Sequence, residues 1–307
     1  MEIVCVYNDK GGVGKTAIAL EMASALATAK KKVLLVDNDP QGSLSALVAK
    51  DLDGIGEGLD AVYSGGKNII ECIRETYIDD MFLVPSGGNL KKHYSDIDKT
   101  DKIISASAAF MKTNNDFIDA IDVVIIDNPP AQDGPPMLWI NEAQRIVIPV
   151  VPDEVCYDAL IRTYQFLENQ AAGFSEKFVV IVPSLVMNRG LHKKYLEAIY
   201  NEFLGKNGNT VVSEVKIANR AEIPESISLR QTLFISHAAS ESAMQMRKLC
   251  LTVFPWIDAG AFSEAIESAA LKKKQAIRDK FKKMVLRNKF PIAKKHPAME
   301  RKVAVHA

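Results

Sequence analysis

Short apolar runs recur along the chain, and each of them ends in a polar or glycine-rich segment. An apolar run without alternation is typical of a strand that is buried on both faces of a parallel sheet. Apolar residues at helical spacing follow several runs, as in residues 18–26. We interpret as strands residues 3–7, 33–36, 81–85, 121–127, 145–152, 177–187 and 210–215. Strands that alternate with helices predict the α/β class, with an open, mostly parallel, doubly wound sheet.

A glycine-rich turn separates the first strand from the first helix. It reads Lys10-Gly11-Gly12-Val13-Gly14-Lys15-Thr16. Backbone N–H groups of such a turn point inward and the helix N-terminus adds partial positive charge, so the segment predicts a phosphate site. Lys15 is expected to reach the β- and γ-phosphates, and the Thr16 hydroxyl to bind Mg²⁺. The strict P-loop pattern has a glycine where this chain has Asp9.

Acidic residues stand at the ends of two later strands. Asp37 and Asp39 follow the second apolar run, and Asp127 ends the run at 121–127. Ligands of parallel sheets bind at the carboxyl ends of the strands. One acid of the first pair is expected to position a water or a hydrated Mg²⁺, although both could simply cap the next helix. Asp127 has the position of a Walker B aspartate, which would hold Mg²⁺ through water.

Charge changes the picture at the C-terminal end. The chain has 307 residues and a net charge of zero, but residues 270–307 hold thirteen Lys or Arg against two acids. Residues 271–290 have the pattern of a basic amphipathic helix with a narrow apolar face. We therefore predict an ATPase-type domain over residues 1–255 and a basic helical extension over residues 256–307.

The extension points to an anionic partner, either nucleic acid or a membrane surface. Its charge density suits DNA phosphates, whereas its apolar face has few large residues and no tryptophan, which is poor for membrane insertion. A helix docked on the acidic body of the same chain is the third interpretation. Membrane binding is thus the least expected of the three.

The cysteines indicate the compartment. Four of them lie far apart without the spacing of a metal site, which suggests buried thiols in a reducing environment. No apolar run approaches the ~20 residues that span a bilayer, and no signal peptide precedes the first strand. We therefore expect a cytoplasmic protein.

The glycine turn, residues 37–41 and residues 126–130 occur in an order and spacing that resemble the ParA/MinD family of ATPases, over roughly residues 1–255. The resemblance implies a nucleotide-sandwich dimer formed on ATP binding, in which Lys10 reaches the partner's ATP as an arginine finger does. It implies that Lys15 binds phosphates within its own subunit. Hydrolysis in the family is slow and is stimulated by a partner protein.

The resemblance also implies the other site residues. Asp37 would orient the attacking water, close to the Mg²⁺ that Thr16 and Asp127 hold. Asn188 follows a strand and could bond either an adenine edge or its own turn; the family places an adenine-contacting asparagine there. The remaining residues implied to contact the nucleotide are Gly11, Gly12, Val13, Gly14 and Ala17.

The chain departs from the family pattern at two site positions. The family usually has a second hydroxyl residue where this chain has Ala17, and commonly a threonine where it has Asn128. Neither departure should abolish phosphate binding, but both could change affinity or rate. No helix-turn-helix is expected before the glycine turn, which begins within ten residues of Met1.

The body of the chain resembles ParA-type members more than MinD-type members, because residues 216–230 fit the former better. We therefore expect nonspecific DNA binding by the ATP-bound dimer on the nucleoid, and a ParB-like, centromere-binding adaptor. The candidate phosphate contacts are the surface residues Arg220, Arg230, Arg247 and Lys248, which could also be ordinary solvated charges.

Two functions of different classes follow. The first is an ATPase that segregates DNA, and the second is a scaffold that positions a protein cargo or the division site, with ATP hydrolysis only as its timer. A relative of the nitrogenase iron protein is not expected, because the cysteines do not fit a shared cluster: Cys5, Cys72, Cys156 and Cys250.

Overall fold

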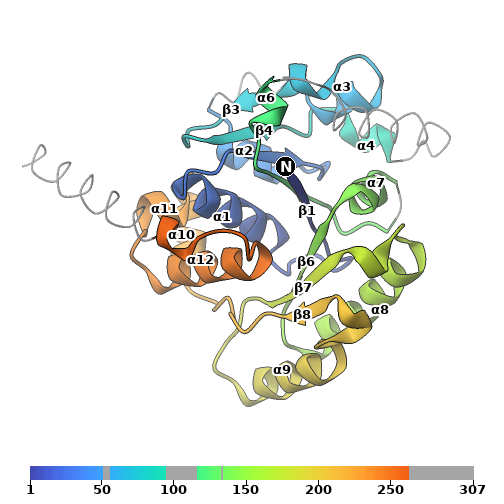
Figure 1. Ribbon diagram of the computed structural model, residues 1–307, viewed down its shortest axis with the longest axis vertical. Helices are drawn as coiled ribbons and strands as arrows, with labels where there is room; N and C mark the ends of the chain where they lie inside the picture. The colour runs from blue at the N-terminus through green and yellow to red at the C-terminus, as the bar shows by residue number, and fades with distance from the viewer. Residues whose placement is uncertain (51–55, 95–115, 133, 263–307) are drawn as a thin grey trace, which may run out of the picture. The chain divides into compact units, whose positions relative to one another are not determined.

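The strand that precedes the glycine-rich turn lies inside the sheet, between two partners that come much later in the chain (Figure 1). The computed structural model describes residues 1–50, 56–94, 116–132 and 134–262. Strand β1 (Glu2–Val6) pairs in parallel with β5 (Val123–Asp127) and with β6 (Arg145–Val150). The register places Val6 opposite Asp127, so the turn after β1 emerges beside the aspartate that ends β5.

The described residues form an eight-stranded sheet in the order β3-β4-β2-β5-β1-β6-β7-β8. All neighbouring strands pair in parallel except β3 and β4, which are antiparallel. The remaining strands are β2 (Val33–Asp37), β3 (Arg74–Glu75), β4 (Met81–Val84), β7 (Phe178–Pro183) and β8 (Thr210–Val212). The predicted α/β class and mostly parallel sheet are therefore confirmed.

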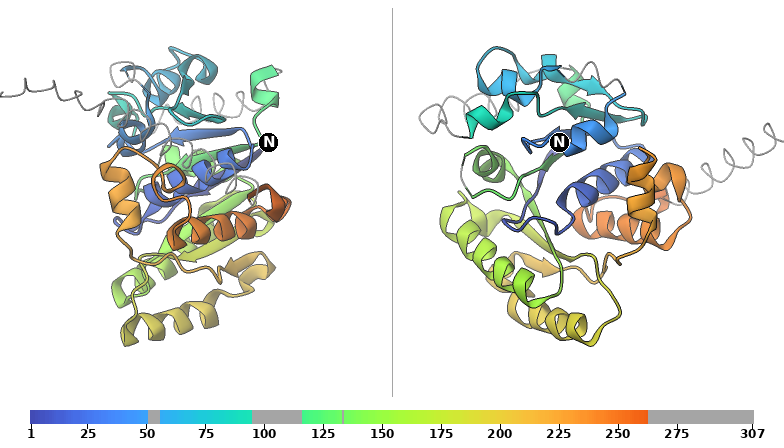
Figure 2. Two further views of the ribbon diagram at one scale, coloured as in Figure 1. Left: turned by 90° about the vertical axis from the view of Figure 1, so that its left-hand side faces the viewer. Right: turned by 180° about the vertical axis from the view of Figure 1, so that it is seen from behind.

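Helices cover both faces of this sheet, as Figure 1 and Figure 2 show. One face packs against α1 (Lys15–Thr28), α2 (Ser43–Val48), α10 (Glu222–Ser228), α11 (Leu233–Ser236) and α12 (Glu241–Val253). The other face packs against α3 (Leu59–Tyr63), α4 (Leu90–His93), α6 (Asp116–Asp119), α7 (Pro135–Glu142), α8 (Glu154–Gln170) and α9 (Gly190–Phe203). Short 3₁₀ turns occur at Ile69–Cys72, Phe174–Glu176 and Lys206–Gly208.

Alternation along the strands divides the core between the two faces. In β2, Val33 and Leu35 belong to the cluster on the α1 face, whereas Leu34 and Val36 belong to the cluster on the opposite face. Both clusters are apolar, which is why the strands appear in the sequence as continuous hydrophobic runs. None of the helices in the described ranges combines the length and apolar character that a bilayer span requires.

The structure adds details that the apolar runs did not predict. Strand β3 is a two-residue edge strand, and β7 ends at Pro183, four residues before the predicted end, close to Leu185 at a φ of 49°. Beyond residue 255, Ile257 and Phe262 are buried in the core on the α1 face. The predicted extension from residue 263 onward, including its basic helix, lies outside the described residues.

Candidate active site

The glycine-rich turn between β1 and α1 has open space beside its three glycines. Gly12 and Gly14 have φ values of 76° and 89°, in the left-handed region that favours glycine. A Cβ atom added to Gly11, Gly12 or Gly14 would meet no atom within 4 Å. Gly14 is also the N-cap of α1, and no side chain caps its first N–H groups. The turn and the helix N-terminus thus offer free donors to an anion.

Lys15 lies across this turn. Its Nζ donates hydrogen bonds to the carbonyl oxygens of Asn8 (3.1 Å) and Lys10 (3.0 Å), so the side chain is already folded over the loop. Burial lowers the pKa of Lys15, and the nearby carboxylates of Asp127 and Asp39 oppose that shift. Among the described residues, the Lys15 ammonium group has only neutral carbonyl oxygens as hydrogen-bond partners. A phosphate group would give it an anionic partner, which binds a cation more strongly.

Hydrogen bonds from neighbouring strands hold the turn in place. Asn8 donates through Nδ2 to the Pro149 carbonyl at the end of β6 (2.8 Å) and accepts at Oδ1 from the Lys10 N–H (2.9 Å). After β7, the Ser184 hydroxyl donates to the Val13 carbonyl (2.7 Å). The phosphate site is therefore fixed to three adjacent strands before any ligand binds, which is the preorganisation that binding requires.

Asp9 occupies the position of the missing first glycine, and it also anchors the turn. The Thr163 hydroxyl of α8 donates to its Oδ1 (2.7 Å), and Nε2 of Gln132, in the loop after β5, donates to its Oδ2 (3.1 Å). The departure from the strict pattern therefore supplies a carboxylate that joins three segments around the site.

Asp127, at the tip of β5, is the least satisfied polar group of the site. Its side chain is 1% exposed, and among the described residues no hydrogen bond reaches either carboxylate oxygen. Burial, with the carboxylate of Asp37 nearby, raises its pKa to about 8, while the Thr16 hydroxyl opposes the shift. An acceptor-only group without donors, beside Thr16 and the phosphate turn, fits the coordination of a hydrated Mg²⁺.

Asp37 stands opposite Asp127 in the register of β2 and β5, but its contacts differ. Its Oδ2 accepts from the N–H (2.7 Å) and the hydroxyl (2.6 Å) of Ser45, and its Oδ1 from the Asp39 N–H (3.2 Å). Burial raises its pKa to about 6. Asp39 is only partly buried, and its Oδ1 accepts from the Gln41 N–H (2.9 Å). The role of Asp37 in orienting water stays a prediction, and Asp39 is the less constrained carboxylate beside it.

A mostly apolar cavity of about 180 Å³ lies beside the start of α1. Its walls include Gly14, Ala17, Leu185, Ile217, Asn219 and Pro224. An apolar slot with an amide at its edge, next to a phosphate site, suits the planar base of a nucleotide. Ala17 thus lines this cavity, where the hydroxyl residue usual in the family would make it smaller and more polar.

Asn188 does not line that cavity. Both Asn188, after β7, and Asn219 are exposed, but only Asn219 is part of the cavity wall. The segment of Asn219 is placed there because Val186 and Ala218 form an isolated parallel bridge beyond the end of β7. The adenine contact of Asn188 stays a prediction. Residues 216–230 were noted in the sequence for their likeness to ParA-type members, but not for a place of Asn219 beside the nucleotide.

The four expected surface cations are distributed unevenly. Arg220 is exposed but forms an ion pair with Glu241, while Arg230 and Lys248 are exposed at the end of α10 and on α12. The expected surface position of Arg247 is wrong, because that side chain is 7% exposed and shares the inner face of α12 with Ala243 and Cys250.

Arg247 is held by contacts inside the protein. Its Nη2 donates to the Ala238 carbonyl (2.9 Å), and its guanidinium lies 4.9 Å from the centroid of the Phe234 ring. Its spacing of four from Ala243 and three to Cys250 places it on the apolar stripe. An arginine that is 7% exposed offers little surface to a DNA backbone, so we do not propose Arg247 as a phosphate contact.

Comparisons with known proteins agree with this geometry. Residues 1–178 match the family model described as an AAA domain. The chain is 28% identical over 171 residues to the chromosome-partitioning ATPase Soj of Treponema pallidum, covering 55% of this chain and 64% of that protein. It is 25% identical over 254 residues to Soj of Thermus thermophilus, covering 80% and 92%. It spans between two fifths and just under two thirds of the first curated relatives it matches.

Solved structures share the fold at low identity. A variant of McdA from Cyanothece in complex with ATP has a TM-score of 0.68 at 17% identity, over 83% of this chain and 96% of that one. The cell division ATPase MinD of Pyrococcus furiosus has a TM-score of 0.64 at 19% identity, over 83% and 99%. With the family model covering more than half of its length, the chain belongs to the ParA/MinD family of P-loop ATPases.

Proposed function

We propose that this protein is an ATPase that segregates DNA, in which ATP assembles a dimer that binds nonspecific DNA and slow hydrolysis releases it. The observation that carries the proposal is the buried Asp127 carboxylate without hydrogen-bond donors, placed beside an unfilled glycine turn. The buried carboxylate is costly in the protein alone and becomes favourable when Mg²⁺ binds, and the open turn with its helix N-terminus is suited to phosphates. The partition ATPases among its relatives support the biological role.

Each residue of the site has a distinct part in this proposal. Lys15 would exchange its carbonyl contacts for phosphate oxygens. Thr16 and Asp127 would hold Mg²⁺, which when bound would supply positive charge to the phosphates. Lys10, half-buried at the start of the turn, supplies a second cation to the nucleotide of the partner subunit. Asp37 or Asp39 orients the attacking water. Val13 and Ala17 contribute backbone N–H groups and, for Ala17, a wall of the base cavity.

The proposed partners are a second copy of the chain, nonspecific DNA and an adaptor of the ParB type. The exposed cations Arg220, Arg230 and Lys248 are the phosphate contacts on the body of the protein. Contacts of this kind give affinity without sequence readout. The protein would then act in the cytoplasm, associated with the nucleoid.

The test is DNA binding by the full-length protein with ATP and with ADP, across a salt series. We expect binding that needs ATP and weakens steeply with salt, since each neutralised phosphate releases counterions. Lys10→Ala should abolish the ATP dependence, whereas Lys50→Ala, an exposed lysine paired with Glu75, should not change it. DNA binding that is equal with both nucleotides, or absent with both, would contradict the proposal.

A cargo-positioning scaffold is the second candidate, and one comparison favours it. The chain is 34% identical over 162 residues to a protein for maintenance of carboxysome distribution from Gloeobacter kilaueensis, over 52% of this chain and 54% of that one. A MinD-like variant of this function would act on a membrane. ATP-dependent binding to anionic liposomes without DNA binding would support it over the segregation function.

A further inference from the structure

A chain of buried hydrogen bonds runs beneath the two aspartates of the site. Asn38 and Asn128, each 0% exposed, directly follow Asp37 and Asp127 at the ends of β2 and β5. Side chains alternate between the faces of a strand, so the two asparagines lie on the face opposite to the two aspartates. Their amides meet there, with Nδ2 of Asn38 donating to Oδ1 of Asn128 (2.9 Å).

Further hydrogen bonds extend from each of the two amides. On one side the Trp139 indole N–H of α7 donates to the Tyr63 hydroxyl of α3 (2.7 Å), which donates to Oδ1 of Asn38 (2.9 Å). On the other side Nδ2 of Asn128 donates to the carbonyl of Val6, the last residue of β1 (3.4 Å). An indole can only donate and a carbonyl can only accept, so the direction of every link is fixed.

Backbone contacts couple this chain of hydrogen bonds to the site. The Asn38 N–H donates to the carbonyl of Asp127 (2.9 Å), and the Tyr94 hydroxyl donates to the carbonyl of Asn38 (2.6 Å). The two asparagines therefore join the carboxyl ends of β1, β2 and β5, which carry the phosphate turn and both aspartates.

Asp127 depends on this support more than Asp37 does. Ser45 holds the carboxylate of Asp37 with two hydrogen bonds, whereas among the described residues the carboxylate of Asp127 has no hydrogen bond of ordinary geometry and only the Thr16 hydroxyl beside it. The direction of the Asp127 side chain therefore depends strongly on the backbone of the strand tip, and the side chain of Asn128, the next residue, joins that tip to β2. The departure from the family pattern at Asn128 is matched by an amide at position 38.

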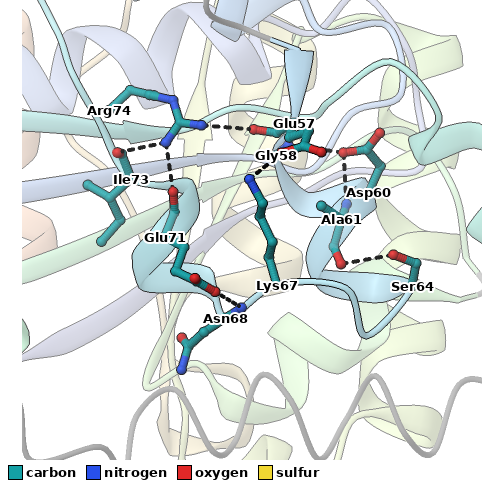
Figure 3. Close-up of polar contacts among 10 residues, drawn as sticks. All are labelled: Glu57, Gly58, Asp60, Ala61, Ser64, Lys67, Asn68, Glu71, Ile73 and Arg74. Carbon is teal, nitrogen blue, oxygen red and sulfur yellow. Dashed lines mark hydrogen bonds and ion pairs between the residues drawn. The ribbon is translucent and has the colours of Figure 1, made fainter.

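Hydrogen bonds of Asp60 hold the start of the helix that carries Tyr63. Figure 3 shows that Oδ1 of Asp60 accepts from the N–H groups of Gly58 (3.0 Å) and Ala61 (2.8 Å) at the start of α3. It also shows the ion pair of Lys67 with Glu57 and the bond from Nη1 of Arg74 to the Glu71 carbonyl (2.8 Å). The position of α3 is therefore connected to Asn38 through the Tyr63 hydroxyl.

We propose that Asn38 and Asn128 are positioning residues that hold the Asp127 carboxylate in the direction Mg²⁺ requires, and that Tyr63 and Trp139 extend this support to α3 and α7. The proposal rests on the proposed nucleotide site. It assigns no direct contact with the nucleotide to any of the four residues.

The experiment measures binding of a fluorescent N-methylanthraniloyl-ADP to the full-length protein, once with Mg²⁺ and once with EDTA. The quantity compared is the gain in affinity that Mg²⁺ gives. Asn128→Leu should lower this gain about 10-fold or more, as is typical when a residue supporting a metal ligand is lost. Affinity in EDTA should stay within about twofold of the wild type, because the phosphate turn is intact.

Three further variants make the result decisive. Tyr63→Phe removes one hydroxyl group and should lower the gain in the same direction, by less, even if Asn128→Leu fails to fold. The double variant Asn38→Leu/Asn128→Leu should lose less than the product of the two single losses, because no amide is left unpaired. The control is Asn209→Leu, a partly buried asparagine before β8 that donates to the Phe174 and Lys177 carbonyls (2.8 and 2.9 Å).

An unchanged gain in folded Asn128→Leu and Tyr63→Phe would overturn the inference, as would an equal loss in Asn209→Leu. Wild-type protein that binds the analogue without any gain from Mg²⁺ would overturn the inference and the metal site. Wild-type protein that fails to bind the analogue in both conditions would overturn the proposed nucleotide site as well. The failure of the inference and the failure of the proposed function are therefore distinguishable in one data set.

Discussion

The single residue with the largest expected effect is Asp127, because its burial without hydrogen-bond donors opposes folding and favours ligand binding. Burial raises its pKa to about 8, above the value in an unfolded chain, so its contribution to stability falls as the pH rises towards 8. The cost is thus largest when the carboxylate is ionised and no cation is bound.

Asp127→Asn should therefore stabilise the nucleotide-free protein at pH 8.5 by about 1–3 kcal/mol and abolish the additional stabilisation that Mg²⁺ gives with ADP. Urea unfolding with and without Mg²⁺ and ADP measures both effects. Asp119→Asn, at an exposed position of α6, is the control and should change neither. A destabilised Asp127→Asn protein would show that the carboxylate has donors after all.

At the scale of elements, a buried glutamate joins the helix after the phosphate turn to the short helix α11. Glu21 of α1 is 0% exposed and accepts from the Leu233 N–H, at the start of α11, with both oxygens (3.2 and 3.0 Å). Beside it, the Ser24 and Thr232 hydroxyls form a second bond between the same segments (2.7 Å). The two contacts fix α11, and the chain that leads to it, against α1.

Burial raises the pKa of Glu21 from its ordinary value near 4.5 to about 8. The folded protein then binds this proton more tightly than the unfolded chain does, and the contribution of Glu21 to stability falls as the pH rises from 4.5 to 8. Glu21→Gln keeps an acceptor for Leu233 and removes the titration.

At pH 8 we expect Glu21→Gln to have a free energy of unfolding higher than that of the wild type by on the order of 2 kcal/mol, and therefore to unfold at a higher temperature. At pH 5 the two proteins should unfold at a similar temperature. The difference between the two proteins is compared across pH, because Asp37 and Asp127 contribute a parallel trend to both. Glu21→Ala, which leaves the Leu233 N–H unpaired, should be destabilised at both pH values. A constant difference between Glu21→Gln and wild type would contradict this prediction.

At the scale of the whole molecule, the exposed cations of the last helices decide how the body of the protein meets DNA. Arg230→Ala and Lys248→Ala should each weaken ATP-dependent DNA binding for all sequences and lower the salt slope by about one. Arg247→Met should leave the salt slope unchanged, because this guanidinium is buried against Phe234. Fluorescence anisotropy of labelled DNA at several salt concentrations checks all three, and a lower slope for Arg247→Met would reverse the assignment.

What could be predicted from the sequence depended on how local each feature is. The phosphate turn, Asp37 and Asp127 lie at the ends of strands, where apolar runs and glycine spacing mark them without knowledge of tertiary contacts. The base cavity was not predicted, because it combines Ala17 with Asn219, about two hundred residues later. Tertiary packing, not local pattern, decides such sites.

Two other differences have equally specific causes. Arg247 was expected on the surface because it is charged, yet the helical period places it on the inner stripe of α12. Asn128 appeared in the sequence only as a departure from a family pattern, since its partner Asn38 is ninety residues away. A polar residue at the end of one buried strand can thus form a hydrogen bond with a polar residue at the end of a neighbouring strand. Which strands are neighbours follows from the order of the sheet and cannot be read from the local sequence.

The position of β1 also determines when during synthesis the protein can fold. Strand β1 leaves the ribosome first, but its neighbours β5 and β6 begin at Val123 and Arg145. At about 5–20 residues per second, a newly made β1 waits for several seconds or longer before it has a partner on either edge. The apolar segment that carries the phosphate turn is then exposed in the nascent chain, so we expect chaperones that hold unfolded segments to bind β1 until β5 and β6 have been made.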